Sequence, residues 1–118
     1  MSNFDTAPVG FFTLDHHGTI LDMNQTGANL IQNSLPMSRH PQFLEFIEEG
    51  DRGRFSTFLH TIFTRPGTQT CTVLLRTGKN STVLCRGRAL DSDGKPIQNC
   101  RIIAIDLPDF LPGAKNEP

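Results

Sequence analysis

The stretch APVGFFTLDHHGTILDMN, residues 7–24, contains two short apolar runs joined by a tight polar connection. Both runs, 9–14 and 19–23, are rich in β-branched and aromatic residues, which are enriched in strands. Asp15 can accept a hydrogen bond from the backbone two residues further on, and Gly18 can take a positive φ without steric cost. The stretch therefore predicts a β-hairpin.

Two adjacent histidines, His16 and His17, lie at the predicted tip of this hairpin. We expect their side chains to diverge into solvent. A metal site at the tip needs a third ligand, which the neighbouring sequence does not obviously supply. We therefore interpret the two histidines as turn residues, and we predict neither a metal site nor a catalytic pair here.

Two short helical segments are expected after the hairpin. Asn24 is a good N-cap for a helix over QTGANLIQ, residues 25–32. In QFLEFIEEG, residues 42–50, the apolar residues stand at i, i+1, i+3 and i+4. This spacing predicts a second helix, which Gly50 ends.

The strongest periodic signal lies in RGRFSTFLHTIFTR, residues 52–65. Its apolar residues follow the helical spacing i, i+3, i+4, i+7 and i+8, and they are Phe55, Phe58, Leu59, Ile62 and Phe63. Asp51 can cap this helix, and Pro66 with Gly67 can end it. With Phe55 at zero, His60 falls at about 140°, outside an apolar stripe of about −60° to +80°. His60 is therefore predicted to lie at the surface.

Three strands are expected in the last third of the chain, over 69–77, 81–90 and 100–107. The first two are joined by the tight turn GKN and the second pair by the longer, turn-forming DSDGKPIQN. Two strands, a helical segment and three further strands predict an α+β fold. We expect a five-stranded antiparallel sheet with short helices packed on one face.

Length and composition favour one soluble domain. The 118 residues suffice for a single hydrophobic core, and we place the domain at 1–107. The tail, 108–118, is rich in Pro, Gly and charge, which is typical of a linker or a frayed end. The net charge is −1 and the Lys and Arg residues are scattered, so we expect no nucleic-acid binding.

The sequence also indicates the cellular compartment of the protein. No apolar run approaches the roughly 20 residues of a membrane span, and the first residues lack the features of a signal peptide. Three cysteines, Cys71, Cys85 and Cys100, cannot all pair within one chain. We therefore expect reduced thiols in a cytoplasmic protein. Cys71 and Cys85 fall on neighbouring predicted strands, where a role as small buried hydrophobes is favoured over redox sensing.

Three motifs in this order resemble a PAS domain, over residues 5–107. The stretch 7–24 is similar to the family pattern A-P-x-G-x-x-x-x-D-x-x-G-x-I-x-x-x-N. FLEFIEEGDRGRF, residues 43–55, resembles the family's helix-loop-helix with an Asp-Arg pair. The segment 76–107 resembles its three-strand meander, with D-x-D-G in the last turn.

The resemblance implies a sensory or dimerisation module of a bacterial signalling protein, commonly one that ends in a histidine kinase or a diguanylate cyclase. The implied partners are a second copy of the chain, an effector domain in the same chain and a small molecule. One departure concerns the end of the domain. The family often continues from Asp-Ile-Thr into a signalling helix, whereas Pro108 follows Leu107 here and disfavours a continuous helix.

The resemblance also implies a ligand cavity between the sheet and the helices. Our candidate lining residues are Phe43, Phe46, Ile47, Phe55, Phe58, Leu59, Ile62, Val73, Leu75, Arg86 and Ala104. Such a lining predicts an apolar or weakly polar ligand. The alternative is that these residues simply fill each other's space.

Arg86 depends on the register of the hairpin formed by 69–77 and 81–90. If Val83 and Cys85 face the helices, Arg86 is solvated. A two-residue turn at Gly78 and Lys79 instead turns Arg86 inward, where it needs an anion such as a ligand carboxylate. The sequence leaves both registers open.

No cofactor is supported by the sequence. Some PAS domains hold haem through a histidine of the long helix, but His60 falls outside its apolar stripe. Residues 99–101, Asn-Cys-Arg, are similar to a motif of flavin-binding domains, whose cysteine forms a flavin adduct. That motif lies on a helix in those domains, whereas here it opens the last predicted strand. The identity of any cofactor therefore stays unknown.

The sequence offers little for catalysis. It contains no Gly-rich phosphate loop, no metal-spaced set of His, Asp or Glu and no G-x-S-x-G pattern. We predict a non-enzymatic sensory and dimerisation module, with a small apolar ligand between sheet and helices as one option. The alternatives are a pure interaction domain without a small ligand and, less favoured, a small unrelated α+β enzyme.

Overall fold

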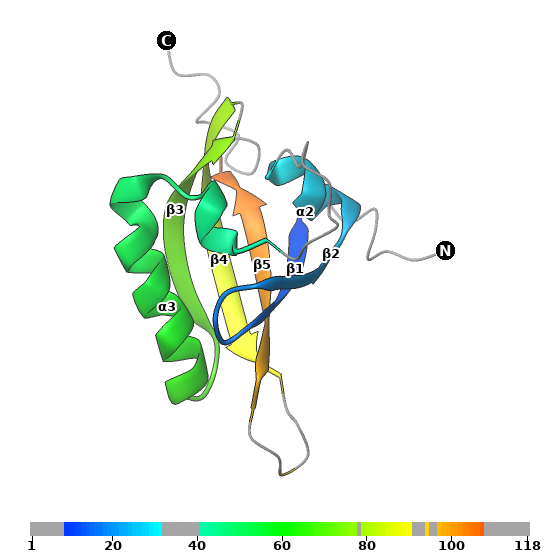
Figure 1. Cartoon of the computed structure of the whole chain (residues 1–118), viewed down its shortest axis with the longest axis vertical. Coiled ribbons are helices and arrows are strands. Elements are labelled where there is room, and N and C mark those ends of the chain that lie inside the picture. Colours follow the sequence, from blue (N-terminus) through cyan, green and yellow to red (C-terminus); the bar gives the residue numbers. More distant parts are fainter. Residues whose placement is uncertain (1–8, 32–40, 78, 91–93, 95–96, 108–118) are drawn as a thin grey trace.

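The computed structural model describes residues 9–31, 41–77, 79–90, 94 and 97–107. One antiparallel sheet has the strand order β2-β1-β5-β4-β3. Its strands are β1 (Gly10–Asp15), β2 (Ile20–Met23), β3 (Gln69–Thr77), β4 (Lys79–Ala89) and β5 (Asn99–Asp106). The helical elements are α2 (Gln25–Leu30), η1 (Phe43–Phe46), η2 (Glu49–Asp51) and α3 (Arg52–Thr64). They cover one face of the sheet, which confirms the predicted α+β architecture (Figure 1).

The first hairpin forms as its turn residues predict. The carboxylate Oδ1 of Asp15 accepts hydrogen bonds from the backbone N–H groups of His17 and Thr19, both at 2.9 Å. Gly18 has a φ of 86°, a conformation that glycine adopts without strain. These contacts reverse the chain and set β2 beside β1.

Asn24 caps α2 as predicted and also joins this helix to the sheet. Its side-chain Oδ1 accepts hydrogen bonds from the N–H groups of Gly27 at 2.8 Å and Phe11 at 2.9 Å. Its Nδ2 donates to the carbonyl oxygen of Val9 at 3.1 Å. Asn24 is buried, so each bond replaces one that water provides in the unfolded chain.

The prediction of a single helix over 42–50 is wrong. Two short 3-10 turns, η1 and η2, occupy this segment, and Ile47 between them is extended, with φ −101° and ψ 139°. The cause is a contact with the sheet: Ile47 bridges to Leu75, and the N–H of Glu48 donates to the carbonyl oxygen of Leu74 at 2.8 Å. The apolar residues of the segment still point into the core.

The long helix α3 agrees with the prediction, but its predicted cap does not. The side chain of Asp51 accepts no capping hydrogen bond from a backbone N–H of the first helical turn. Its Oδ2 instead accepts the N–H of Leu74 on β3 at 2.8 Å, and its Oδ1 lies 3.2 Å from a guanidinium nitrogen of Arg54. Asp51 therefore attaches the start of α3 to the edge of the sheet.

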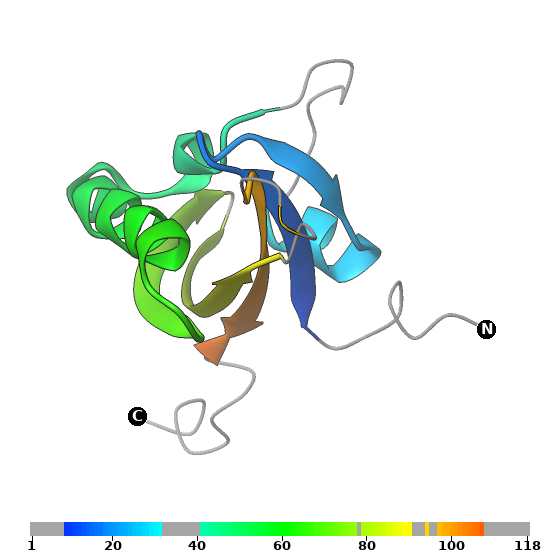
Figure 2. The ribbon, with the colours of Figure 1, turned by 90° about the horizontal axis from the view of Figure 1, so that it is seen from below.

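The register of β3 and β4 settles which face each residue occupies. Cys71 lies opposite Cys85 and Val73 opposite Val83, and all four face the helices. Seen along the sheet, α3 lies beside β3 at one end of the strand order (Figure 2). In the part of the chain that the structure describes, no helix is long and apolar enough to cross a membrane.

Candidate functional site

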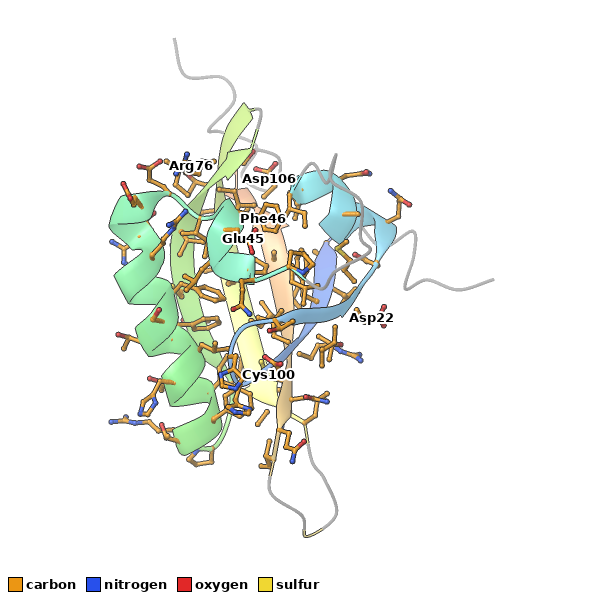
Figure 3. The ribbon with its side chains drawn as sticks, viewed as in Figure 1. Asp22, Glu45, Phe46, Arg76, Cys100 and Asp106 are labelled. Carbon is orange, nitrogen blue, oxygen red and sulfur yellow. The ribbon has the colours of Figure 1, made fainter. Side chains whose placement is uncertain are left out.

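The predicted lining residues, with one exception, meet between the inner face of the sheet and the helices η1 and α3. Ten of them are buried, namely Phe43, Phe46, Ile47, Phe55, Phe58, Leu59, Ile62, Val73, Leu75 and Ala104. On η1, the apolar side chain of Phe46 is buried, whereas that of Glu45 is exposed (Figure 3). These ten residues therefore share one buried layer, and their binding of a ligand stays a prediction.

Aromatic rings fill much of the space between the two layers. The rings of Phe43 and Phe55 stack with centroids 5.0 Å apart and an interplanar angle of 9°. Phe12 meets Phe43 edge-on at 4.9 Å, and Phe58 lies 5.4 Å from Phe55. Such ring pairs add to the stability gained by burial alone. The alternative reading, in which these residues fill each other's space, fits these contacts.

Phe12 was missing from the predicted lining set. It is 1% exposed and contacts the centre of the phenylalanine cluster. The alternation along β1 carried the signal, because Gly10, Phe12 and Leu14 share the buried face.

Arg86 is the exception among the predicted lining residues. It is exposed and lies opposite Thr70 and Ile103, on the face of the sheet away from the helices. Its neighbours Cys85 and Gly87 take the inward positions. The register that turns Arg86 inward does not occur, so the suggestion that it binds a ligand carboxylate between the layers is wrong.

All three cysteines are free and buried. Burial raises the pKa of Cys100 from its ordinary value of 9.0 to about 12, and it raises that of Cys85 further. Burial also raises the pKa of Cys71, although the charge of Arg54 opposes the shift. Because the thiolate is the reactive form, these environments favour packing over redox chemistry at neutral pH.

Cys71 and Cys85 face each other directly across β3 and β4. The backbone groups of Thr72 and Leu74 bond to residues on the far side of β3. Because backbone groups alternate in direction along the strand, Cys71, which precedes Thr72, points its own groups towards β4. In an antiparallel ladder, the side chains of such a hydrogen-bonded pair are farther apart than those of the non-hydrogen-bonded pairs on either side. A disulfide needs Cβ atoms within about 3.5–4.5 Å, which this pair type does not favour.

The two histidines at the first hairpin tip are both exposed, as predicted, but they do not diverge. Their ring centroids are 4.0 Å apart, and the ring of His16 meets Phe63 edge-on at 6.5 Å. Phe63 comes from the last turn of α3, which the sequence could not place beside the tip. Among the described residues, no group of three His, Cys, Asp or Glu side chains could hold a metal ion. His60 is exposed, as its helical position predicts.

In the described part of the chain, two open grooves border α3, and Phe58 of the aromatic cluster lines one of them. One, of ≈ 370 Å³, runs between α3 and β3 and is lined by Arg54, Thr57, Phe58, Thr61, Gln69, Thr70 and Cys71. The other, of ≈ 410 Å³, lies at the end of α3 and includes Phe63, Arg65, Arg88 and Ile97. The sequence did not predict either groove, because each groove is lined by residues from different elements of the fold.

The outer face of the sheet carries an apolar patch beside a basic one. Leu84 lies opposite Ile105, and Phe11 lies opposite Ile103; all four are half-buried. The exposed basic residues Arg86, Arg88 and Arg101 continue the same face. The described helices all cover the other face of the sheet. The apolar side chains at these alternate strand positions were the sequence signal for this patch.

Comparison with known proteins agrees with this architecture. The family described as PAS fold matches residues 4–109. A PAS domain of an HTR-like protein from Haloarcula marismortui is 20% identical, with a TM-score of 0.71 over 88% of this chain and 85% of that one. A PAS domain from Colwellia psychrerythraea is 14% identical, with a TM-score of 0.76 over 88% and 90% of the two chains.

A third similar structure is a sensory box histidine kinase/response regulator from Burkholderia thailandensis. It is 17% identical, with a TM-score of 0.66 over 96% of this chain and 87% of that one. The search of curated proteins found no match. The match of the family to nearly the whole chain and the shared sheet with its helical layer lead to one conclusion: this chain belongs to the PAS family of sensory domains.

Proposed function

We propose that this domain is the sensory and dimerisation module of a bacterial signal-transduction protein, and that it acts mainly through protein contacts. The outer-face residues Phe11, Leu84, Ile103 and Ile105 carry the proposal, because they form an apolar patch on the face that the described helices leave open. Apolar side chains that gather on an open sheet face are typical of interaction sites. The partner we propose is a second copy of the chain.

The domain itself is proposed to be non-catalytic and cytoplasmic. The catalytic step then belongs to an effector domain in the same chain, of the histidine kinase or diguanylate cyclase type. Similarity to a sensory box histidine kinase supports the first of these types. Residues 108–118, which we expect to form a linker, lie outside the described residues.

A small apolar ligand between the sheet and the helices is the second candidate. The observation that favours it is the chemistry of the layer, where the ten buried lining residues are all apolar. The observation that disfavours it is the contact of Phe12, Phe43 and Phe55 with one another, since a ligand has to displace or separate these rings. Contacts through the outer face require no such rearrangement.

The dimer is tested by substituting Ile103 with glutamate, which places a charge in the centre of the apolar patch. Sedimentation velocity is expected to show a dimer for the wild-type protein and at least about tenfold weaker association for Ile103→Glu. The control is Ser56→Glu on the exposed side of α3, which is expected to leave the dimer intact. Thermal unfolding of each variant separates loss of association from loss of folding.

A monomeric wild-type protein at high concentration, or equal association of Ile103→Glu, contradicts the proposed dimer. Native mass spectrometry of protein purified from its natural host then decides the second candidate. A stoichiometric bound molecule favours ligand sensing. A ligand-free protein that also fails to dimerise contradicts both forms of the proposed function.

A further inference from the structure

Strand β3 lies at one edge of the sheet, and part of its free edge is closed by polar contacts. The N–H of Leu74 donates to Asp51, and the carbonyl oxygen of Leu74 accepts the N–H of Glu48, both at 2.8 Å. The carbonyl oxygen of Thr72 accepts a guanidinium hydrogen of Arg54 at 2.9 Å. These contacts close the edge from the carbonyl group of Thr72 to Leu74.

The same edge is open nearer the start of the strand. Backbone groups alternate in direction along an antiparallel strand, so Thr70 points its N–H and its carbonyl oxygen the same way as Thr72 and Leu74. Within the described part of the chain, no residue bonds to these groups of Thr70 or to the N–H of Thr72. Unpaired edge groups of this kind form a template for a further strand.

The open part of the edge adjoins the groove between α3 and β3, which has a volume of ≈ 370 Å³. Phe58 and Cys71 provide its apolar surface, and Thr57 and Thr61 line it from the helix. Arg54 is the charged lining residue, its side chain is 58% exposed, and no lining residue is acidic. Its Nη1 already contacts Asp51 and the carbonyl oxygen of Thr72, so a ligand carboxylate would bind the other side of the guanidinium. The groove therefore suits an apolar side chain with a carboxylate near Arg54.

We propose that this groove binds an extended peptide segment of a partner protein. The segment adds as a further strand beside Gln69–Thr72, places an apolar side chain over Phe58 and Cys71, and directs an acidic side chain to Arg54. Strand addition combines backbone hydrogen bonds, which give affinity, with side-chain pockets, which give selectivity. The groove lies at the β3 edge and shares no residue with the outer-face patch of Phe11, Leu84, Ile103 and Ile105, so this inference does not depend on the proposed dimer.

A single extended segment fits this edge better than a second folded copy. The helix α3 runs alongside β3 at the end of the sheet (Figures 1 and 2). Two copies that joined their β3 edges would bring one α3 against the other, whereas one strand needs only the space beside the edge. The lining of the groove, which combines Phe58 and Cys71 with hydroxyl and amide side chains and one cation, sets the composition of that strand.

The test uses random twelve-residue peptides displayed on phage and selected on the whole chain. The decisive variant is Thr70→Pro, which removes the outward N–H but no bond within the sheet, since proline is tolerated at a strand edge. The matched control is Thr70→Val, which keeps the N–H and the β-branched shape. We expect selected peptides with alternating apolar residues and at least one carboxylate, and at least about tenfold weaker binding to Thr70→Pro.

A second variant keeps the test valid if Thr70→Pro misfolds. Thr57→Tyr fills the groove from the exposed side of α3 and is expected to weaken binding of the same peptides by a similar factor. Equal binding to wild type, Thr70→Pro and Thr57→Tyr contradicts the proposal. Failure to select any peptide on the wild-type protein contradicts it as well, as does selection of peptides that bind through the outer sheet face and are lost in Ile103→Glu.

Discussion

Asp51 and Leu74, 23 positions apart in the sequence, are joined by a hydrogen bond of 2.8 Å from the N–H of Leu74 to the carboxylate. This bond fixes the first turn of α3 to the sheet edge. Arg54 strengthens the junction, because its guanidinium contacts both Asp51 and the carbonyl oxygen of Thr72. The helix therefore keeps its place beside β3 through polar contacts at its start and apolar contacts along its length.

Replacing Asp51 with alanine is expected to lower the free energy of unfolding by about 1.5–3 kcal/mol, the range for a hydrogen bond to a charged group. The reason is that the N–H of Leu74 loses its acceptor, and Arg54 loses its counter-ion. Urea denaturation measures the change. Glu49→Ala, at an exposed position of η2, is the control and is expected to stay within about 0.5 kcal/mol of wild type. Equal stability of the two variants contradicts the role of Asp51.

Asn24→Ala is expected to cost about 2–4 kcal/mol, because it leaves buried backbone groups without partners. The affected groups are the N–H of Phe11, the N–H of Gly27 and the carbonyl oxygen of Val9. Thermal and urea unfolding are suitable measurements. Asn29→Ala, at an exposed position in the same helix, serves as the control. A small effect at Asn24 shows that water replaces the amide without penalty.

Two glycines give opposite expectations for substitution by alanine. At Gly87 an added Cβ lies 2.8 Å from Cδ1 of Ile62 and 2.9 Å from Cγ1 of Ile102, so Gly87→Ala is expected to destabilise by about 1–3 kcal/mol. At Gly53, inside α3, an added Cβ meets nothing within 4 Å. Gly53→Ala is therefore expected to stabilise by about 0.5–1 kcal/mol. Urea unfolding of both variants tests the pair, and an effect of the same sign in both contradicts the geometry.

The buried thiols predict a loss of stability at alkaline pH. The pKa of Cys100 is raised in the folded state from 9.0 to about 12, and that of Cys85 is raised further. Between these values the unfolded chain loses thiol protons that the folded chain retains, so the free energy of unfolding falls as pH rises above 9. Urea titrations from neutral to alkaline pH measure the slope. A double variant with alanine at both positions is expected to have a shallower slope, and an unchanged slope assigns the effect to other groups.

Local signals in the sequence were sufficient for the hairpin and the long helix. Asp15 and Gly18 determine the first turn through contacts within a few residues, and the spacing of Phe55, Phe58 and Ile62 determines the buried face of α3. Both features depend on interactions between near neighbours in the chain, so the pattern of residue types was enough to predict them. The same holds for the buried alternation of the later strands.

Features that depend on distant partners could not be predicted. The segment 42–50 forms two 3-10 turns instead of one helix, because the backbone of Ile47 and Glu48 pairs with β3. The side chain of Asp51 bonds to Leu74 instead of capping its own helix, and His16 lies against Phe63. Arg86 illustrates the same limit within the site, because its direction follows from the pairing of β3 with β4, which a sequence pattern alone left open.

The first and last strands of the domain are neighbours at the centre of the sheet. Gly10, at the start of β1, lies opposite Ala104, near the end of β5, whereas Asp15 lies opposite Asn99 at the far end of the pair. A pulling force applied at the two ends of the domain therefore loads one end of the β1–β5 ladder first. Its hydrogen bonds break one after another, as in unzipping, and not together, as in shear. We therefore expect the domain to yield at lower tension along the line that joins its two ends than a domain whose terminal strands are loaded in shear.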